Sequence, residues 1–445
     1  MDNTAKMNTK PVILGGEPAV KDIPAELFAW PVITKEDEDA VLEVLRRGGM
    51  SGTDVTQRFA EEFKAWQGCK YAVGVNNGTA AILSAMWACG VGVGDEVICP
   101  SLTYWASALP AYQLGATVVF ADVDPESLCI SPPDIERRIT ERTKAVVPVH
   151  YLGHPAEMDA IMDIAERHNI KVIEDVSHAQ GGHYKNKKLG LWGNVGAMSL
   201  MSQKSFATGE MGMIVTDNKQ IYERAVAFGH YERFDSSITD EWLSRYAGLP
   251  MGGVKNRVHQ LSSAVGRVQL KYYDERIREI RAAIDYFWSR LDGKKGLRPH
   301  KINPQTGDMG GWYFPHGLYF PEELGGLSIT AFAGAINKEG VPCWTGGNTP
   351  LHKHPLFHTA DIYGHGKPTR IANSSRDVRE GDKSLPVSDG ISKRLCQIPY
   401  FKRLLKGHID KYADAFIRVL DSYEDLLKND KGDPDLLGNW YLARG

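Results

Sequence analysis

Short apolar runs alternate with helical patterns along the first half of the chain. Strand-like runs, rich in Val and Ile, are found at residues 71–75, 96–99, 117–121, 145–149 and 171–173. Helical patterns are found at residues 79–88, 104–114, 133–139 and 156–168. The strands show little alternation of apolar and polar positions, which is typical of parallel sheets that helices cover on both faces. The first half therefore predicts an α/β fold with a mostly parallel sheet.

The pattern changes after residue 256. Residues 256–291 predict one or two long charged helices, and strand-like segments follow, among them 311–320. A polar segment at 358–384 and a helix at 407–427 precede a polar tail. The predicted division is an N-terminal arm (1–35), a large α/β domain (36–275) and a small C-terminal α+β domain (276–445).

Composition excludes several classes of protein. The 445 residues carry 52 Lys and Arg against 55 Asp and Glu, which argues against a DNA-wrapping or polybasic membrane-surface protein. No apolar run approaches the ~18 residues of a membrane span, and the first twenty residues lack an apolar secretory segment. The six cysteines include no Cys-x-x-Cys pair, which suits a reducing compartment and gives no zinc site. We expect a cytoplasmic protein that binds neither nucleic acid nor membrane.

Candidate chemistry lies where strands end, because ligands of such sheets bind beyond the carboxyl ends of the strands. Gly78 and Thr79 stand between a strand and a helix, where free amides, a hydroxyl and the helix dipole would hold a phosphate. A plain turn with Thr79 as the helix cap is the alternative. Tyr104 follows another strand, and its ring could face a planar ligand or simply pack.

Two charged groups complete this set. The strand that ends in Glu174 and Asp175 brings a carboxylate to the sheet end, where burial requires a cation or a hydrogen-bond donor. Lys204 lies in a Ser- and Gly-rich loop, where its amine could act as a nucleophile. A phosphate site, an acid, an amine and an aromatic ring match the needs of pyridoxal 5′-phosphate. The lysine would bond to its aldehyde, and the acid would keep its pyridine nitrogen protonated.

Other templates do not fit the sequence. It contains no Gly-x-x-x-x-Gly-Lys-[Ser/Thr] loop for nucleotide phosphates and no Gly-x-Ser-x-Gly nucleophile turn. The spacing of His352, His354, His358 and His365 fits no helical metal site, so we predict no metal. We expect these histidines to line a polar substrate mouth or an exposed loop.

Short segments in a fixed order resemble the DegT/DnrJ/EryC1/StrS sugar aminotransferases, which are pyridoxal-phosphate enzymes of fold type I. The resemblance runs from about residue 30 to residue 427. Its segments include Trp30-Pro31, Asn77-Gly78-Thr79, Gly94-Asp95-Glu96, Pro100-Ser101-Leu102-Thr103-Tyr104, Pro148-Val149-His150, Asp175-Val176-Ser177-His178-Ala179-Gln180, the loop at 199–212 and Leu385-Pro386-Val387. The expected fold is a large domain with a mostly parallel sheet and a smaller α+β domain.

The resemblance implies a role for each candidate residue. Lys204 would be the Schiff-base lysine, Asp175 would pair with the pyridine nitrogen, and His178 would lie beside the phenolic oxygen. Tyr104 would stack on the ring. The phosphate would be bound by Gly78, Thr79 and Ser199. The family also implies a homodimer with active sites shared between the subunits.

Two segments depart from the family pattern. Met211 stands in Gly209-Glu210-Met211-Gly212 where the family usually has glycine, which puts a bulkier side chain near the backbone. Lys255 stands where the family usually has an Asn that reaches the neighbouring subunit's phosphate. A lysine can still pair with a phosphate as a point charge.

The implied reaction is amino transfer in two halves, by a ping-pong mechanism. Glutamate or glutamine would give its amino group to the cofactor, and a keto sugar or keto-cyclitol would then receive it, with Lys204 moving the proton. No cluster of basic residues indicates a pocket for a diphosphate, which favours a cyclitol or free sugar as the acceptor. The stretch at 344–348 could supply hydrogen bonds to hydroxyls. The alternatives are a dehydratase of the same family, like aminohydroxybenzoate synthase, and a non-catalytic binding or regulatory protein on this fold.

Overall fold

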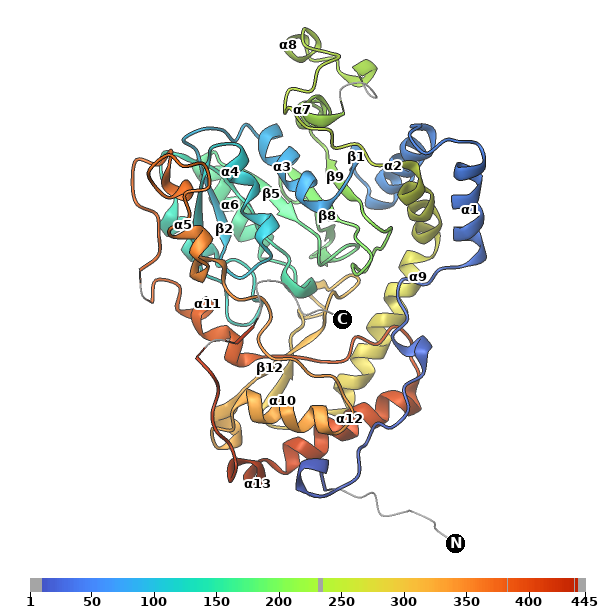
Figure 1. Cartoon of the computed structure of the whole chain (residues 1–445), viewed down its shortest axis with the longest axis vertical. Coiled ribbons are helices and arrows are strands. Elements are labelled where there is room, and N and C mark those ends of the chain that lie inside the picture. Colours follow the sequence, from blue (N-terminus) through green and yellow to red (C-terminus); the bar gives the residue numbers. More distant parts are fainter. Residues whose placement is uncertain (1–9, 231–234, 382, 436, 439–445) are drawn as a thin grey trace.

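A seven-stranded sheet forms the centre of the protein (Figure 1). The computed structural model describes residues 10–230, 235–381, 383–435 and 437–438. The strands lie in the order β1-β9-β8-β5-β4-β2-β3. Their bounds are β1 Tyr71–Val75, β2 Glu96–Pro100, β3 Thr117–Ala121, β4 Thr143–Val146, β5 Lys171–Asp175, β8 Val195–Ser199 and β9 Gly212–Thr216. Neighbours from β3 to β8 are parallel, and β9 runs against β8 and β1. The predicted mostly parallel α/β sheet is confirmed.

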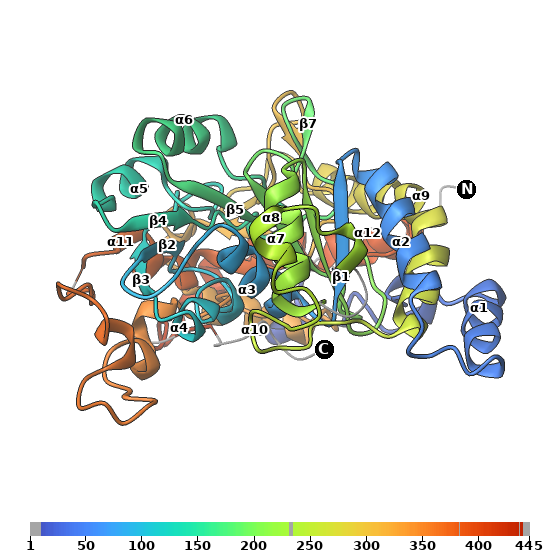
Figure 2. The same ribbon diagram turned by 90° about the horizontal axis from the view of Figure 1, so that it is seen from above.

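Helices cover both faces of this sheet (Figure 2). Successive strand residues point to opposite faces, so Ile98 and Val172 join one core with α5 and α6, whereas Val97 and Ile173 join another with α3 and α7. Figure 2 shows α5 and α6 on the side of the sheet opposite α3 and α4. The bounds are α3 Gly78–Ala88, α4 Pro110–Gln113, α5 Pro132–Arg138, α6 Met158–His168 and α7 Lys219–Gly229.

The expected helix at 104–114 is wrong in its extent. The chain forms a 3-10 turn at Trp105–Ser107 and the short helix α4 at Pro110–Gln113. Proline has no amide hydrogen and favours the first turn of a helix, so Pro110 begins a new helix instead of continuing one.

The long helix α9 (Gln260–Arg290) joins the two halves of the chain. Near its start it packs on α1 (Lys35–Arg46) and α2 (Asp54–Gln67), where Arg267 pairs with a glutamate of α2. Near its end it packs on α12 (Lys406–Asp421). The sequence allowed one or two helices here, and the structure has one. The predicted division at residue 275 falls inside this helix and stays a prediction.

A smaller unit lies beyond α9 (Figure 1). Its sheet has the order β10-β12-β13, with β10 at Leu297–Pro299, β12 at His316–Tyr319 and β13 at Leu395–Gln397. Its helices are α10 (Ile329–Lys338), α12 and α13 (Tyr423–Leu427). The expected strand at 311–320 shrinks to β12, because Trp312 (φ 51) and Phe314 (φ 44) hold the backbone in the left-handed region.

The remaining elements are short. A small antiparallel sheet is made of β6 His183–Tyr184, β7 Lys187–Lys188 and β11 Gly307–Asp308. Two short helices are α8 (Glu241–Ser244) and α11 (Pro386–Gly390). None of the helices in the described ranges is long and apolar enough to cross a membrane.

The polar segment at 358–384 covers the open edge of the central sheet at β3. Arg370 donates from Nε to the Val118 carbonyl of β3 at 2.8 Å. Asn373 donates to the carbonyl of Gly115, just before β3, at 3.0 Å, and Arg376 pairs with Glu96 at 2.8 Å. An open strand edge is a template for association with other chains, and this segment covers it.

Candidate active site

Asp175 lies at the carboxyl end of β5, in the middle of the central sheet. Its carboxylate is 5% exposed and accepts hydrogen bonds from Ser107 Oγ at 2.7 Å and from the Ser177 amide at 3.1 Å. The preceding Glu174 points to the other face, where it accepts from the amides of Gly190 and Gly193 at 2.7 Å. Because side chains alternate along a strand, only Asp175 is directed at the site.

Lys204 lies in the loop between β8 and β9. Its side chain is 8% exposed, and its Nζ is 4.0 Å from the centre of the Tyr313 ring. Burial lowers the pKa of this amine to about 8, and the nearby charge of Asp175 acts in the opposite direction. Lys204 and Asp175 are both buried, and the charge of Asp175 acts on the amine, so the space around this amine is the candidate site.

His178 borders this space. Its ring is 4.3 Å from the Tyr313 ring, and its Nδ1 accepts the Leu152 amide at 3.3 Å. Burial, and then the charge of Lys204, lower the pKa of His178 well below its usual value. The imidazole is therefore neutral, with its proton on Nε2, and can donate one hydrogen bond to a ligand.

The first turn of α3 forms an anion-binding corner. Asn77 caps the helix by accepting the Ala80 amide at 2.8 Å, so the cap is not Thr79. The amides of Gly78 and Thr79 have no partner among the described residues. A Cβ on Gly78 would lie 2.6 Å from the Cβ of Ser199, so the absent side chain brings Ser199 against the helix end. Free amides at a helix start are suited to a phosphate.

Tyr104 and Lys255, the other two predicted residues, are not buried. Tyr104 is part-exposed just after β2 and its ring contacts that of Trp105, with the ring centres 5.0 Å apart. Lys255 is exposed and lines a separate cavity of about 190 Å³ together with Arg257 and His259. Within the described chain, no contact joins Lys255 to Lys204 or Asp175.

Three site residues carried no signal in the sequence. Ser107 holds Asp175, Tyr313 lies under Lys204, and the indole of Trp30 donates to the Lys204 carbonyl at 2.9 Å. Trp30 was noted only as part of a motif. Tyr313 lies between two residues with positive φ, and strain of this kind often marks a functional site.

Met211 is accommodated by a glycine on the neighbouring strand. Its side chain is fully buried, and a Cβ on Gly74 would lie 2.5 Å from its Cε. The Met211 side chain therefore fits because Gly74, which has no side chain, leaves room for it.

The histidines at 352–365 do not share one set of contacts. His352 contacts Ser101 Oγ at 2.6 Å and Asp389 at 3.1 Å, whereas His365 is exposed. In the part of the chain that the structure describes, no three His, Cys, Asp or Glu side chains are placed to hold a metal.

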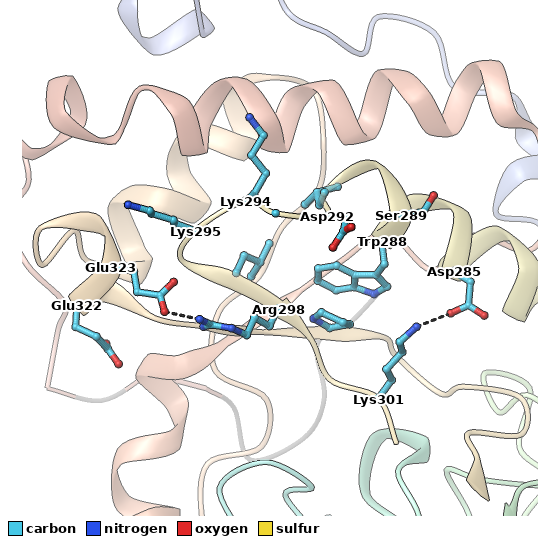
Figure 3. A pocket seen from close by; sticks show the side chains of 14 residues that line it. Asp285, Trp288, Ser289, Asp292, Lys294, Lys295, Arg298, Lys301, Glu322 and Glu323 are labelled. Carbon is cyan, nitrogen blue, oxygen red and sulfur yellow. Dashed lines mark hydrogen bonds and ion pairs between the residues drawn. The ribbon is translucent and has the colours of Figure 1, made fainter. Parts of the chain in front are cut away.

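A cavity of about 1080 Å³ lies apart from these residues, beside the end of α9. Figure 3 shows two ion pairs among its charged side chains, Arg298 with Glu323 and Lys301 with Asp285. None of the predicted site residues lines it.

Comparisons with known proteins point to one family of enzymes. The model of the DegT/DnrJ/EryC1/StrS aminotransferase family matches residues 31–416. The spore coat polysaccharide biosynthesis protein SpsC of Bacillus subtilis is 33% identical over 87% of this chain and 95% of its own length. The L-glutamine:2-deoxy-scyllo-inosose aminotransferase of Streptoalloteichus tenebrarius is 31% identical over 89% of this chain and 95% of its own. The X-ray structure of an aminotransferase from Psychrobacter cryohalolentis matches with a TM-score of 0.77 and 27% identity, over 89% of this chain and 100% of that chain.

Proposed function

The chain belongs to the DegT/DnrJ/EryC1/StrS aminotransferase family, and from that membership we propose a pyridoxal 5′-phosphate-dependent transfer of an amino group from glutamine or glutamate to a keto sugar or keto-cyclitol. Two buried groups support this most directly: the Lys204 amine and the Asp175 carboxylate, whose charge acts on that amine. A buried amine with a lowered pKa and a specific charge partner is typical of an active site.

The residues present fit pyridoxal 5′-phosphate. Asp175 would hold the ring nitrogen and His178 the phenolic oxygen. The free amides of Gly78 and Thr79 lie beside Ser199 and would hold the phosphate. Tyr104 would stack on the ring. When bound, this group supplies an electron-withdrawing ring.

The protein groups divide the remaining work. In the first half-reaction the Lys204 amine would take the proton from the α-carbon of the amino donor and pass it to the aldehyde carbon of the cofactor. In the second half it would move a proton from that carbon to the acceptor carbon that receives the amino group. Trp30 and the Met201 carbonyl, which accepts the Lys204 amide at 2.8 Å, fix the backbone of this lysine. Ser107 keeps the Asp175 carboxylate in place, because it donates a hydrogen bond to it.

Assembly and location are part of the proposal. A homodimer would bring the exposed Lys255 of one subunit toward the phosphate of the other, as the family pattern suggests. The cysteines of the described chain are all free, which suits the cytoplasm. The arm, large domain and small domain would divide near residues 35 and 275.

A keto-cyclitol is the acceptor that we favour. The relative from Streptoalloteichus carries an inosose and glutamine in its name. The test incubates the protein, loaded with pyridoxal 5′-phosphate, with glutamine and a panel of keto acceptors. We expect glutamine consumption with 2-deoxy-scyllo-inosose and an amino product in equal amount by mass spectrometry. A dehydrated or aromatised product would instead support the dehydratase alternative, and no consumption with any acceptor would contradict the proposal.

The lowered pKa of Lys204 predicts a pH dependence. Only the neutral amine attacks an aldehyde, so in the cofactor-free protein the rate of reaction with pyridoxal 5′-phosphate should rise with pH and level off above a midpoint of about 8. An ordinary lysine would have a midpoint near 10.4. The growth of a visible absorption band measures the rate. Asp175→Asn should move the midpoint lower, because the Asp175 charge raises this pKa. A wild-type midpoint near that of ordinary lysine would contradict the assignment.

A further inference from the structure

The last described part of the chain returns from α13 to a loop beside the site. We call residues 430–435 and 437–438 the strap; it lies beyond residue 416, where the family match ends. The strap is tied to the start of α10. Asp430 accepts hydrogen bonds from the Ser328 amide at 2.7 Å and its hydroxyl at 2.6 Å. Asp433 accepts from the amide and hydroxyl of Thr330 at 2.9 and 2.7 Å.

The end of the strap crosses the loop at 344–349 backbone to backbone. A Cβ on Gly346 would lie 2.6 Å from the amide nitrogen of Gly438, and a Cβ on Gly438 would lie 3.0 Å from the Gly347 carbonyl. All three glycines have positive φ, between 81° and 94°. No side chain would fit in this crossing, so the strap touches the loop itself.

The same loop is joined to the catalytic residues on its other side. The side-chain Oδ1 of Asn348 accepts a hydrogen bond from the Tyr151 hydroxyl at 2.7 Å, and the backbone amide of Asn348 donates one to that hydroxyl oxygen at 3.1 Å. The Tyr151 ring is 5.7 Å from the ring of His178. A further link is the Leu351 amide, which donates at 2.8 Å to Ser101, three residues before Tyr104. Movement of the loop would therefore change the wall of the site near His178.

The loop carries a buried side-chain donor that has no partner among the described residues. Asn348 is 1% exposed, and its Nδ2 makes no hydrogen bond within the described residues. Because Oδ1 already accepts the Tyr151 hydroxyl, turning the side-chain amide around would leave Oδ1 unpaired in place of Nδ2. A buried donor left unpaired is costly, and a hydroxyl oxygen of a ligand would remove that cost. Residues 344–349 include no ionisable side chain, so the loop offers a diphosphate no cation.

We propose that loop 344–349 is the acceptor-facing wall, that Asn348 Nδ2 binds a hydroxyl of an uncharged, small hydroxylated ring, and that the strap holds this wall in place. The inference rests on the proposed amino transfer and names its acceptor class. The strap contacts the backbone of Gly346 and Gly347, so a nucleotide placed against that part of the loop would have to displace it. The strap therefore favours a free cyclitol or sugar over a nucleotide-linked one.

The test releases the strap without touching the site. The double variant Asp430→Ala/Asp433→Ala removes both anchors, and Asp425→Ala on α13 is the matched control, because the ion pair that Asp425 forms within the described residues is with exposed Lys428. In the double variant KM for 2-deoxy-scyllo-inosose should rise about tenfold, since a displaced wall binds less well. The half-reaction with glutamine should stay within about twofold of wild type, and GDP-4-keto-6-deoxy-D-mannose should become a better substrate. Gly438→Val should reproduce the KM change by steric clash.

Hydrogen exchange gives a second readout that needs no turnover. The amides of Gly346 and Asn348 are hydrogen-bonded, to Leu395 and Tyr151, and should exchange faster in the double variant but not in the control. Unchanged hydrogen exchange and an unchanged acceptor KM in the double variant would overturn the proposed role of the strap. An equal loss in the donor and acceptor half-reactions would also overturn it. If wild-type protein failed to consume glutamine with any acceptor, the proposed function itself would fail.

Discussion

Replacing Lys204 with alanine should reduce amino transfer by at least about 10⁴-fold, the upper range for the loss of a positioned acid–base group. The loss should exceed that of other site changes because this amine both bonds the cofactor and moves the proton. Turnover of glutamine with 2-deoxy-scyllo-inosose measures the effect. The visible absorption band of the loaded protein should disappear in the same variant.

Controls separate the chemistry from folding. Lys188→Ala is a matched control, because Lys188 is also partly buried with a lowered pKa but contacts Trp66 away from the site. It should keep the visible band and near-normal turnover. Added methylamine should restore part of the activity of Lys204→Ala, since the reaction needs an amine at that place. Retention of full turnover by the alanine variant would show that another group carries the proton.

The residues that we propose for the site could be singled out in the sequence because each lies next to an element with a clear local pattern. Asp175 ends a strand of apolar residues, Gly78 begins a helix, and Lys204 lies in a loop of small residues. In a parallel sheet all such strand ends meet at one edge, so the chain order alone brings these residues together. The buried positions of Asp175 and Lys204 agree with that expectation.

The supporting groups could not be predicted, because their contacts join distant parts of the chain. Tyr313 reaches Lys204 across 109 residues of sequence only because the backbone around it turns through positive φ values that no composition signal marks. The contact between Gly438 and Gly346 likewise depends on the packing of the small unit. Strand direction has the same limit: the apolar run at β9 is no different from its neighbours, yet it runs antiparallel to β8, to which the loop at residues 200–211 connects it without a crossover helix.

The cover of the sheet edge depends on one buried ion pair. Arg370 and Glu380 have side chains that are 0% and 1% exposed, and two hydrogen bonds of 2.7 and 2.6 Å join them. The same guanidinium reaches the Val118 carbonyl at 2.8 Å and lies 4.6 Å from the centre of the Phe120 ring. Arg370 thus satisfies an edge carbonyl of β3 and fixes the segment at 358–384 upon it.

Breaking this pair should be costly, whereas replacing it whole should not. Arg370→Met should lower the free energy of unfolding by about 3–5 kcal/mol, because Glu380 would stay buried without a cation. The double variant Arg370→Met/Glu380→Met should recover most of that loss, since it buries no unpaired charge. Arg379→Met, which breaks a more exposed pair with Asp377 in the same segment, should lower the free energy of unfolding far less, because water screens that pair. Urea denaturation of the wild type and these three variants, followed by circular dichroism, compares their free energies of unfolding. Equal destabilisation by Arg370→Met and Arg379→Met would mean that the buried pair does not hold the segment on β3.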